Sequence, residues 1–175
     1  MLRGLDAPGG VFFVQGDSDH YLELTSFLPA TGIVPLFDET ADVTVGDRQV
    51  RIGGIRNREY GYDESNAVVR QLEDAPEDGT IRILVSHRPD VVNVLSDDSR
   101  IDLTVAGHTH GGQIVLPFVG PPVTLSDVPR SVARGGLHSV DDNPIVVSSG
   151  VGMVRGQAPQ VRFLSRPSIT VIDLE

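Results

Sequence analysis

Three short stretches of the chain place polar, metal-binding side chains directly after an apolar run. The residues concerned are Asp17, His87, His108 and His110. Open α/β sheets bind ligands beside the carboxyl ends of their strands, so these side chains converge if the three strands are neighbours. Carboxylate oxygen and imidazole nitrogen suit divalent zinc, manganese or iron. The pattern therefore predicts a metal site.

The run His-Thr-His-Gly-Gly-Gln at residues 108–113 is the most specific of these signals. A single histidine after a strand is most often structural, and His138 receives only that interpretation. Paired histidines in a glycine-rich strand exit have few structural uses, so a metal role is predicted for His108 and His110. On an extended turn, the two would face two adjacent ions, one each. Gly107, Gly111 and Gly112 would allow positive φ angles.

A later loop has the composition of a phosphate-binding segment. Gly150 and Gly152 precede Arg155 in it, and Arg162 follows a few residues on. Backbone N–H groups of such a Gly-x-Gly turn, with a neighbouring arginine, can hold phosphate oxygens. A surface turn is the alternative interpretation.

Composition narrows the classes of function. The 175 residues contain no cysteine, which excludes disulfides, zinc ribbons and thiol nucleophiles. All 14 basic residues are arginine, against 24 acidic residues, for a net charge of −10. No nucleic-acid partner is expected from such a chain, and a lysine Schiff base is excluded. No apolar run approaches the length of a membrane span, so the chain as given is expected to be soluble, in the cytoplasm or associated with the envelope.

The periodicity of apolar residues predicts one α/β domain over residues 1–175. Helices are expected at 18–28, 63–72 and 91–95. Strands are expected at 11–15, 33–36, 43–45, 49–55, 81–85, 103–106, 113–116, 145–147 and 168–174, with a turn at Gly46-Asp47. Residues 117–143, rich in Pro, Gly and Ser, are expected to form an irregular surface excursion.

These residues resemble the calcineurin-like metallophosphoesterases, in particular the branch related to bacterial phosphodiesterases of the cell envelope. The similarity is highest at residues 107–114 (Gly-His-Thr-His-Gly-Gly-Gln-Ile), and continues at 116–118, 120, 148–152, 161–163 and 166–169. The resemblance implies a four-layer α/β/β/α sandwich, of which this chain would hold a part. It also implies two divalent metal ions, a bridging hydroxide that attacks phosphorus, and a small phosphoester substrate.

The resemblance further implies how the ligands divide between the two metals. Asp17, His87 and His108 would bind one ion, and His110 would bind the other together with an Asp-x-His pair. A Gly-Asp motif would supply the bridging carboxylate. Ser18, Gly152, Arg155 and Arg162 are the expected substrate-binding residues. Manganese, iron and zinc all suit the ligand set.

Two departures from the family pattern affect the expected activity. The usual Gly-Asn-His-Asp stretch is Gly16-Asp17-Ser18-Asp19, so Ser18 replaces a histidine that contacts the phosphate. Loss of general-acid assistance costs about 10²–10⁴-fold in rate. The Asp-x-His and Gly-Asp motifs belong before residue 11, so the domain is expected to be incomplete at its N-terminus.

Weak or absent hydrolysis by this chain alone is therefore expected. A metal-dependent phosphohydrolase fragment is the first hypothesis. One half of a split enzyme, with a second chain completing the fold, is the second. A non-catalytic module that binds a single metal ion is the third.

Overall fold

The computed structural model describes residues 4–57, 66–154 and 159–173. Its helices and strands alternate along the chain. The strands are β1 (Phe12–Phe13), β2 (Val34–Pro35), β3 (Glu39–Val45), β4 (Arg48–Ile55), β5 (Ile81–Ser86), β6 (Leu103–Ala106), β7 (Gly136–Val140) and β8 (Asn143–Val147). The α-helices are α1 (Tyr21–Phe27), α2 (Asn66–Glu73) and α3 (Arg130–Ala133), and the 3-10 helices are η2 (Leu28–Thr31), η4 (Pro89–Val94) and η5 (His110–Gly112).

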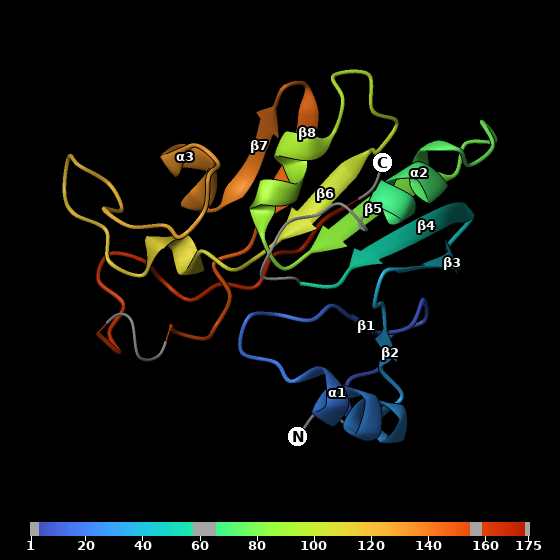
Figure 1. Ribbon diagram of the computed structural model, residues 1–175, viewed down its shortest axis with the longest axis horizontal. Helices are drawn as coiled ribbons and strands as arrows, with labels where there is room; N and C mark the ends of the chain where they lie inside the picture. The colour runs from blue at the N-terminus through green and yellow to red at the C-terminus, as the bar shows by residue number, and fades with distance from the viewer. Residues whose placement is uncertain (1–3, 58–65, 155–158, 174–175) are drawn as a thin grey trace.

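A six-stranded mixed sheet in the order β3-β4-β5-β6-β8-β7 forms the centre of the molecule (Figure 1). Strands β4, β5, β6 and β8 are parallel, while β3 and β7 pair antiparallel at the two edges. Because the four central strands are parallel, their carboxyl ends meet at one edge of the sheet. That edge is where the predicted metal-binding side chains follow β5 and β6.

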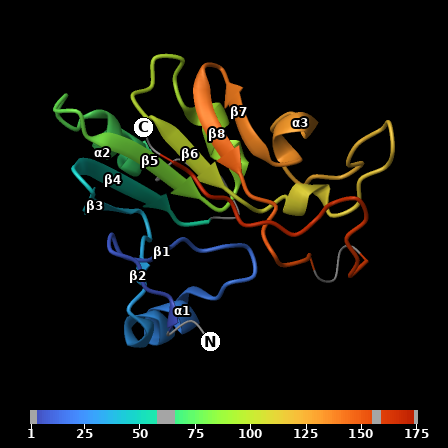
Figure 2. The ribbon, with the colours of Figure 1, turned by 180° about the vertical axis from the view of Figure 1, so that it is seen from behind.

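The apolar face of α2 packs on this sheet. Val68 and Leu72 are fully buried and belong to the main core with Leu84 of β5. Gly53 of β4 makes the contact close, because a Cβ at this position would lie 2.7 Å from Val68. Helices α2 and η4 cover one face of the sheet, and the segment 165–173 crosses the opposite face (Figure 2).

A second, two-stranded parallel sheet of β1 and β2 lies between the large sheet and α1 (Figures 1 and 2). Leu36, directly after β2, is fully buried against β4, where a Cβ at Gly54 would lie 2.2 Å from the Leu36 Cβ. This contact fixes the small sheet against the large one. The arrangement confirms the predicted α/β class and is consistent with the sandwich that the resemblance implies.

Several predicted elements need correction. The strands expected at 113–116 and 168–174 are wrong for the described residues: Ile114 and Leu116 make only isolated bridges, and 168–173 makes none. Both segments have β-type composition, but neither finds a partner strand to complete a ladder. The region 117–143 is more regular than expected, since α3 and β7 lie within it.

The other predicted elements are present, and all but the strand at 103–106 have shifted ends. The helix expected at 18–28 is confined to α1, and His20 precedes it as the N-cap. The helix expected at 91–95 is the 3-10 helix η4, and Gly46, with φ 64°, makes the predicted turn between β3 and β4. Part of the helix expected at 63–72 lies outside the described residues. None of the described helices is both long and apolar enough to cross a membrane.

Candidate metal site

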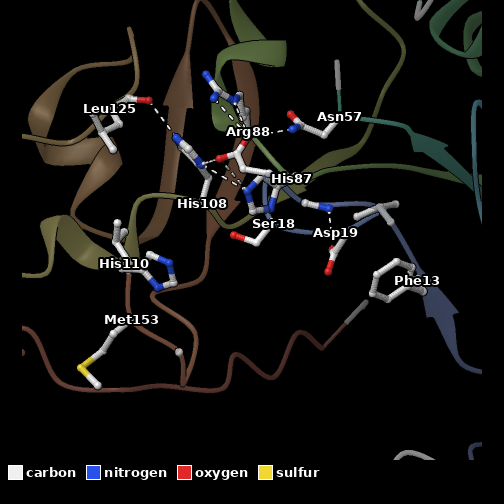
Figure 3. A pocket seen from close by; sticks show the side chains of 15 residues that line it. Phe13, Ser18, Asp19, Asn57, His87, Arg88, His108, His110, Leu125 and Met153 are labelled. Atoms are coloured by element: carbon white, nitrogen blue, oxygen red, sulfur yellow. Dashed lines mark hydrogen bonds and ion pairs between the residues drawn. The ribbon is translucent and has the colours of Figure 1, made fainter. Parts of the chain in front are cut away.

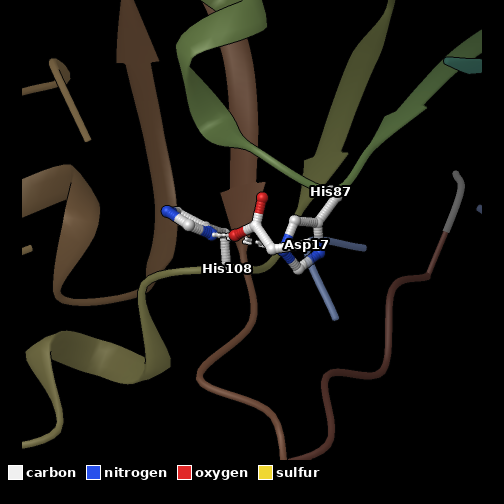
Figure 4. A group of neighbouring side chains, drawn as sticks. All are labelled: Asp17, His87 and His108. Carbon is white, nitrogen blue, oxygen red and sulfur yellow. Dashed lines mark hydrogen bonds and ion pairs between the residues drawn. The ribbon is translucent and has the colours of Figure 1, made fainter. Parts of the chain in front are cut away.

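Asp17, His87 and His108 converge at the carboxyl edge of the large sheet (Figure 4). Asp17 Oδ2 lies 2.7 Å from His108 Nδ1 and 3.3 Å from His87 Nε2. The two imidazole nitrogens are 3.2 Å apart. Among the residues that the structure describes, this is the one group of three His, Asp or Glu side chains whose ligand atoms all lie within 4.8 Å of one another.

The strand register brings the two histidines together. Ser86, the last residue of β5, pairs with Ala106, the last residue of β6. His87 and Gly107-His108 therefore follow the two strands side by side. The Gly107 N–H then donates to the His87 carbonyl over 3.1 Å. His108 has a φ of 67°, a left-handed conformation uncommon outside glycine and often found at functional sites. The chain thus turns sharply at His108 and aims its ring at His87.

Asp17 reaches the same point from the short loop after β1. Gly16 N–H donates to Asp19 Oδ2 over 2.8 Å, which closes this loop. A Cβ at Gly16 would lie 3.0 Å from the His87 ring, so glycine lets the loop approach the histidine closely. The glycine before Asp17 therefore serves the geometry of the site.

The second nitrogen of His108 is fixed by the chain itself. His108 Nε2 lies 2.8 Å from the Leu125 carbonyl oxygen, which can only accept, so the ring hydrogen sits on Nε2. In the neutral ring, Nδ1 then carries a lone pair that faces the Asp17 carboxylate. The lone pair and Asp17 Oδ2 lie 2.7 Å apart, so one cation, a proton or a metal ion, can be shared between them. Such a backbone contact is how proteins orient ligating histidines.

Asn57 and Arg88 hold the other carboxylate oxygen of Asp17. Asn57 Nδ2 donates to Oδ1 over 2.7 Å, and Arg88 Nη2 donates to the same oxygen over 3.1 Å. Oδ2 is thereby left facing the two histidines. Neither residue is among the predicted site residues, although each follows a strand as the predicted ligands do: Asn57 comes two residues after β4, and Arg88 comes directly after His87.

Electrostatics favour the metal-binding forms of Asp17 and His87. Burial acts to raise the pKa of Asp17, but the charge of His108 and the hydrogen bond from Arg88 outweigh it and lower this pKa. Burial lowers the pKa of His87. A carboxylate that stays charged and a histidine that stays neutral are the states in which both side chains bind metal ions.

His110 lines the same cavity but stands apart from the other three residues (Figure 3). The expectation of an extended turn is wrong, because Thr109 is helical and His110 begins the 3-10 helix η5. Burial, followed by the charge of Arg162, lowers the pKa of His110. Whether His110 binds a second ion stays a prediction.

The predicted substrate-binding residues differ in where they lie relative to the cavity. Ser18 and Gly152 line the cavity, which measures about 940 Å³. The Arg162 guanidinium instead donates to the backbone carbonyls of His110, Ser149 and Gly152 and binds these segments together. Arg155 lies outside the described residues.

The three side chains fit a small divalent cation. Ligand atoms bound at about 2.0–2.2 Å around a tetrahedral ion lie roughly 3.3–3.6 Å apart. The separations of 3.2 and 3.3 Å that involve His87 are close to this range, and the 2.7 Å between Asp17 and His108 is shorter, at hydrogen-bond distance. One carboxylate and two imidazoles also form a donor set that zinc, manganese and iron accept.

Comparisons with known proteins identify relatives of the chain. The chain is 30% identical over 180 residues to the metallophosphoesterase YkuE of Bacillus subtilis (strain 168), covering 100% of this chain and 59% of that protein. It is 31% identical over 147 residues to the phosphodiesterase YaeI of Escherichia coli (strain K12), covering 84% of this chain and 49% of that protein. A metallophosphoesterase of Aquifex aeolicus (strain VF5) is 28% identical over 181 residues, covering 100% and 64%.

The chain belongs to the metallophosphoesterase family. No family model matches it. Membership assigns the chain to a family of hydrolases and implies divalent metal ions, for which Asp17, His87 and His108 are the candidate ligands. The chain spans about half to two thirds of the length of these relatives, at 59%, 49% and 64%.

Proposed function

We propose that this metallophosphoesterase chain binds one divalent cation through Asp17, His87 and His108 and hydrolyses a phosphoester beside it. The observation that carries this proposal is the convergence of three ligand atoms, with the His108 tautomer set by the Leu125 carbonyl. When bound, a divalent ion acts as a Lewis acid toward a phosphoryl oxygen and lowers the pKa of water.

Arg88 is the residue best placed to bind the phosphoryl group. It is the one arginine among the described residues that line the cavity. Its guanidinium has five N–H donors, and only Nε and Nη2 contact Asp17, which leaves donors for a substrate oxygen. Arg162, by contrast, has its donors directed at backbone carbonyls. We therefore assign the phosphate-binding role to Arg88, with Ser18 and Gly152 as further contacts.

A finer part of the proposal concerns rate. Ser18 has a hydroxyl that stays protonated at neutral pH, so it is a poor general acid for the leaving group. His110 stands outside the cluster, and its carbonyl and Nδ1 already face Arg162. For these two reasons we propose slow hydrolysis by the chain alone, and faster hydrolysis when another polypeptide segment supplies further ligands.

The same two features favour a second candidate function, a non-catalytic module that binds a single metal ion. It requires the cluster of Asp17, His87 and His108 but no turnover. The two candidates share the metal site and differ in whether a bound phosphoester is cleaved.

Metal content and turnover test both candidates. We expect about one ion per chain after manganese loading and desalting, and much less in His108→Ala. His138→Ala is the matched control, because this histidine lies in β7, outside the residues that line the cavity, and its ring Nε2 lies 3.1 Å from the Gly135 carbonyl oxygen. Slow hydrolysis of bis(p-nitrophenyl) phosphate that is lost in His108→Ala and reduced in Arg88→Gln supports the enzyme. One bound ion without turnover supports the binding module, and absence of a bound ion refutes both.

A further inference from the structure

A second hollow adjoins the metal site and has a different character. It measures about 290 Å³, and its apolar walls come from Ile114, Val123, Leu125 and Val154. His108, Leu125 and Val154 line both this hollow and the large cavity, so the two spaces meet beside the metal-binding ring. An apolar hollow next to a charged site is the usual form of a subsite for part of a ligand.

Gly112 and Gln113 build this hollow. A Cβ at Gly112 would lie 2.1 Å from the Pro121 Cβ, so glycine is needed for the 121–125 loop to approach. Buried Gln113 donates from Nε2 to the Pro159 carbonyl and accepts from the Val154 N–H, each over 2.7 Å. One side chain thus holds two walls of the hollow in place. The Gly-Gly-Gln part of the His-Thr-His-Gly-Gly-Gln run therefore shapes the hollow rather than ligating metal.

Thr109 supplies a second, independent observation that points to a ligand. Thr109 is among the residues that line the hollow and is only 4% exposed. Its hydroxyl has no hydrogen-bond partner within residues 4–57, 66–154 and 159–173. A buried hydroxyl without a partner is unfavourable, and a polar atom of a ligand would relieve that cost.

We propose that this hollow binds the apolar substituent of the phosphoester substrate, an alkyl or aryl group joined to phosphorus through an ester oxygen. This assignment rests on the function proposed above. The phosphoryl group occupies the large cavity at Arg88, and the substituent extends past His108 between Val123 and Ile114. The Thr109 hydroxyl donates to a polar atom of the substrate where the substrate enters the hollow. The preferred substrate is thus amphipathic.

Calorimetric binding of methyl, butyl, hexyl and decyl phosphate to the manganese-loaded chain tests this assignment. Burial of each additional methylene tightens binding by up to about fourfold. We expect Kd to fall from methyl to butyl phosphate and to level off once the chain outgrows the 290 Å³ hollow. Binding of methyl phosphate with no gain for butyl phosphate overturns the subsite alone. Failure of methyl phosphate itself to bind overturns the proposed function and the subsite with it.

Variants locate the subsite. Ile114→Thr combined with Val123→Thr should remove most of the gain for butyl phosphate and leave methyl phosphate binding unchanged. Val123→Thr alone, at a 62% exposed position, gives a smaller loss in a chain that folds without difficulty. Val119→Thr, at a similarly exposed position shortly before the 121–125 loop and outside the hollow, is the matched control. An equal loss in the control overturns the assignment.

Thr109→Val tests the hydroxyl. It should weaken all the alkyl phosphates by roughly 2–10-fold, the value of one hydrogen bond. Thr104→Val is its control, because Thr104 is also buried without a hydroxyl partner among the described residues but lies in β6 away from the hollow. Unchanged binding in Thr109→Val overturns the hydroxyl contact.

Discussion

Asp90 is expected to control metal affinity without touching the metal. Its Oδ1 accepts hydrogen bonds from the Ser126 hydroxyl, over 3.1 Å, and from the Asp127 N–H. These contacts anchor the loop directly after Leu125, whose carbonyl accepts the Nε2 hydrogen of His108. In Asp90→Ala both contacts are lost, so the loop and its carbonyl can move away from the histidine.

The expected magnitude follows from this chain of contacts. Loss of a partner that orients a metal-bound histidine costs about 10–100-fold in metal affinity. Asp90 acts on His108 only through the loop that carries Leu125, so we expect the lower end of this range of affinity loss, about tenfold or 1.4 kcal/mol. Two lost hydrogen bonds also lower the free energy of unfolding by roughly 1–3 kcal/mol. Both effects should appear together, because they have one structural cause.

Competition with a chelator measures the manganese affinity, and urea unfolding measures the stability. Asp90→Asn is the conservative variant, since its side-chain oxygen still accepts, and it should recover most of the affinity. Asp42→Ala is the control for a lost carboxylate, because Asp42 pairs with Arg51 at the far edge of the sheet. A folded Asp90→Ala chain that binds manganese as tightly as the wild type would refute the reasoning.

Three further predictions concern stability and pH. Leu84→Ala should lower the free energy of unfolding in urea by about 2–5 kcal/mol, because this side chain is fully buried. Leu137→Ala, at a 70% exposed position, should change it by less than about 0.5 kcal/mol, and equal effects would contradict the assigned core. Gly54→Ala should cost at least about 1–3 kcal/mol in thermal unfolding, because the new Cβ would overlap Leu36, and an unchanged melting temperature would contradict that contact. Burial lowers the pKa of His87 below the 6.5 of the unfolded chain. Between these two values the unfolded chain binds more protons than the folded chain, so the free energy of unfolding falls as pH falls. Manganese affinity should fall with further acidification, because protons then compete with the metal for His87. A His87→Gln variant should lack this stability loss, and an equal loss in both chains would refute the assignment to His87.

Much of the fold was accessible from the sequence because it depends on local patterns. The strand at 103–106 was predicted with its observed bounds, and so was the turn at Gly46. The strand after that turn was predicted to within one residue, whereas β3 begins four residues before its predicted start. The regularity of 117–143 could not be predicted, because β7 forms only by pairing with β8, and turn-rich composition hides that long-range contact. The segment at 168–173 shows the opposite error, since β-type residues form a strand only when a partner is available.

The sequence by itself determined the kind of site: carboxylate and imidazole groups after apolar strands, in a glycine-rich context that resembles metallophosphoesterases. Residue types determine which ions can bind, so that conclusion needed no coordinates. Only the tertiary structure decided which groups meet. It brought Asn57 and Arg88 to Asp17, tied Arg162 to backbone carbonyls, and set the His108 tautomer through Leu125. These contacts join residues that lie 10 to 71 positions apart in the sequence. Strand register and packing bring such residues together, and no local sequence pattern specifies their contact.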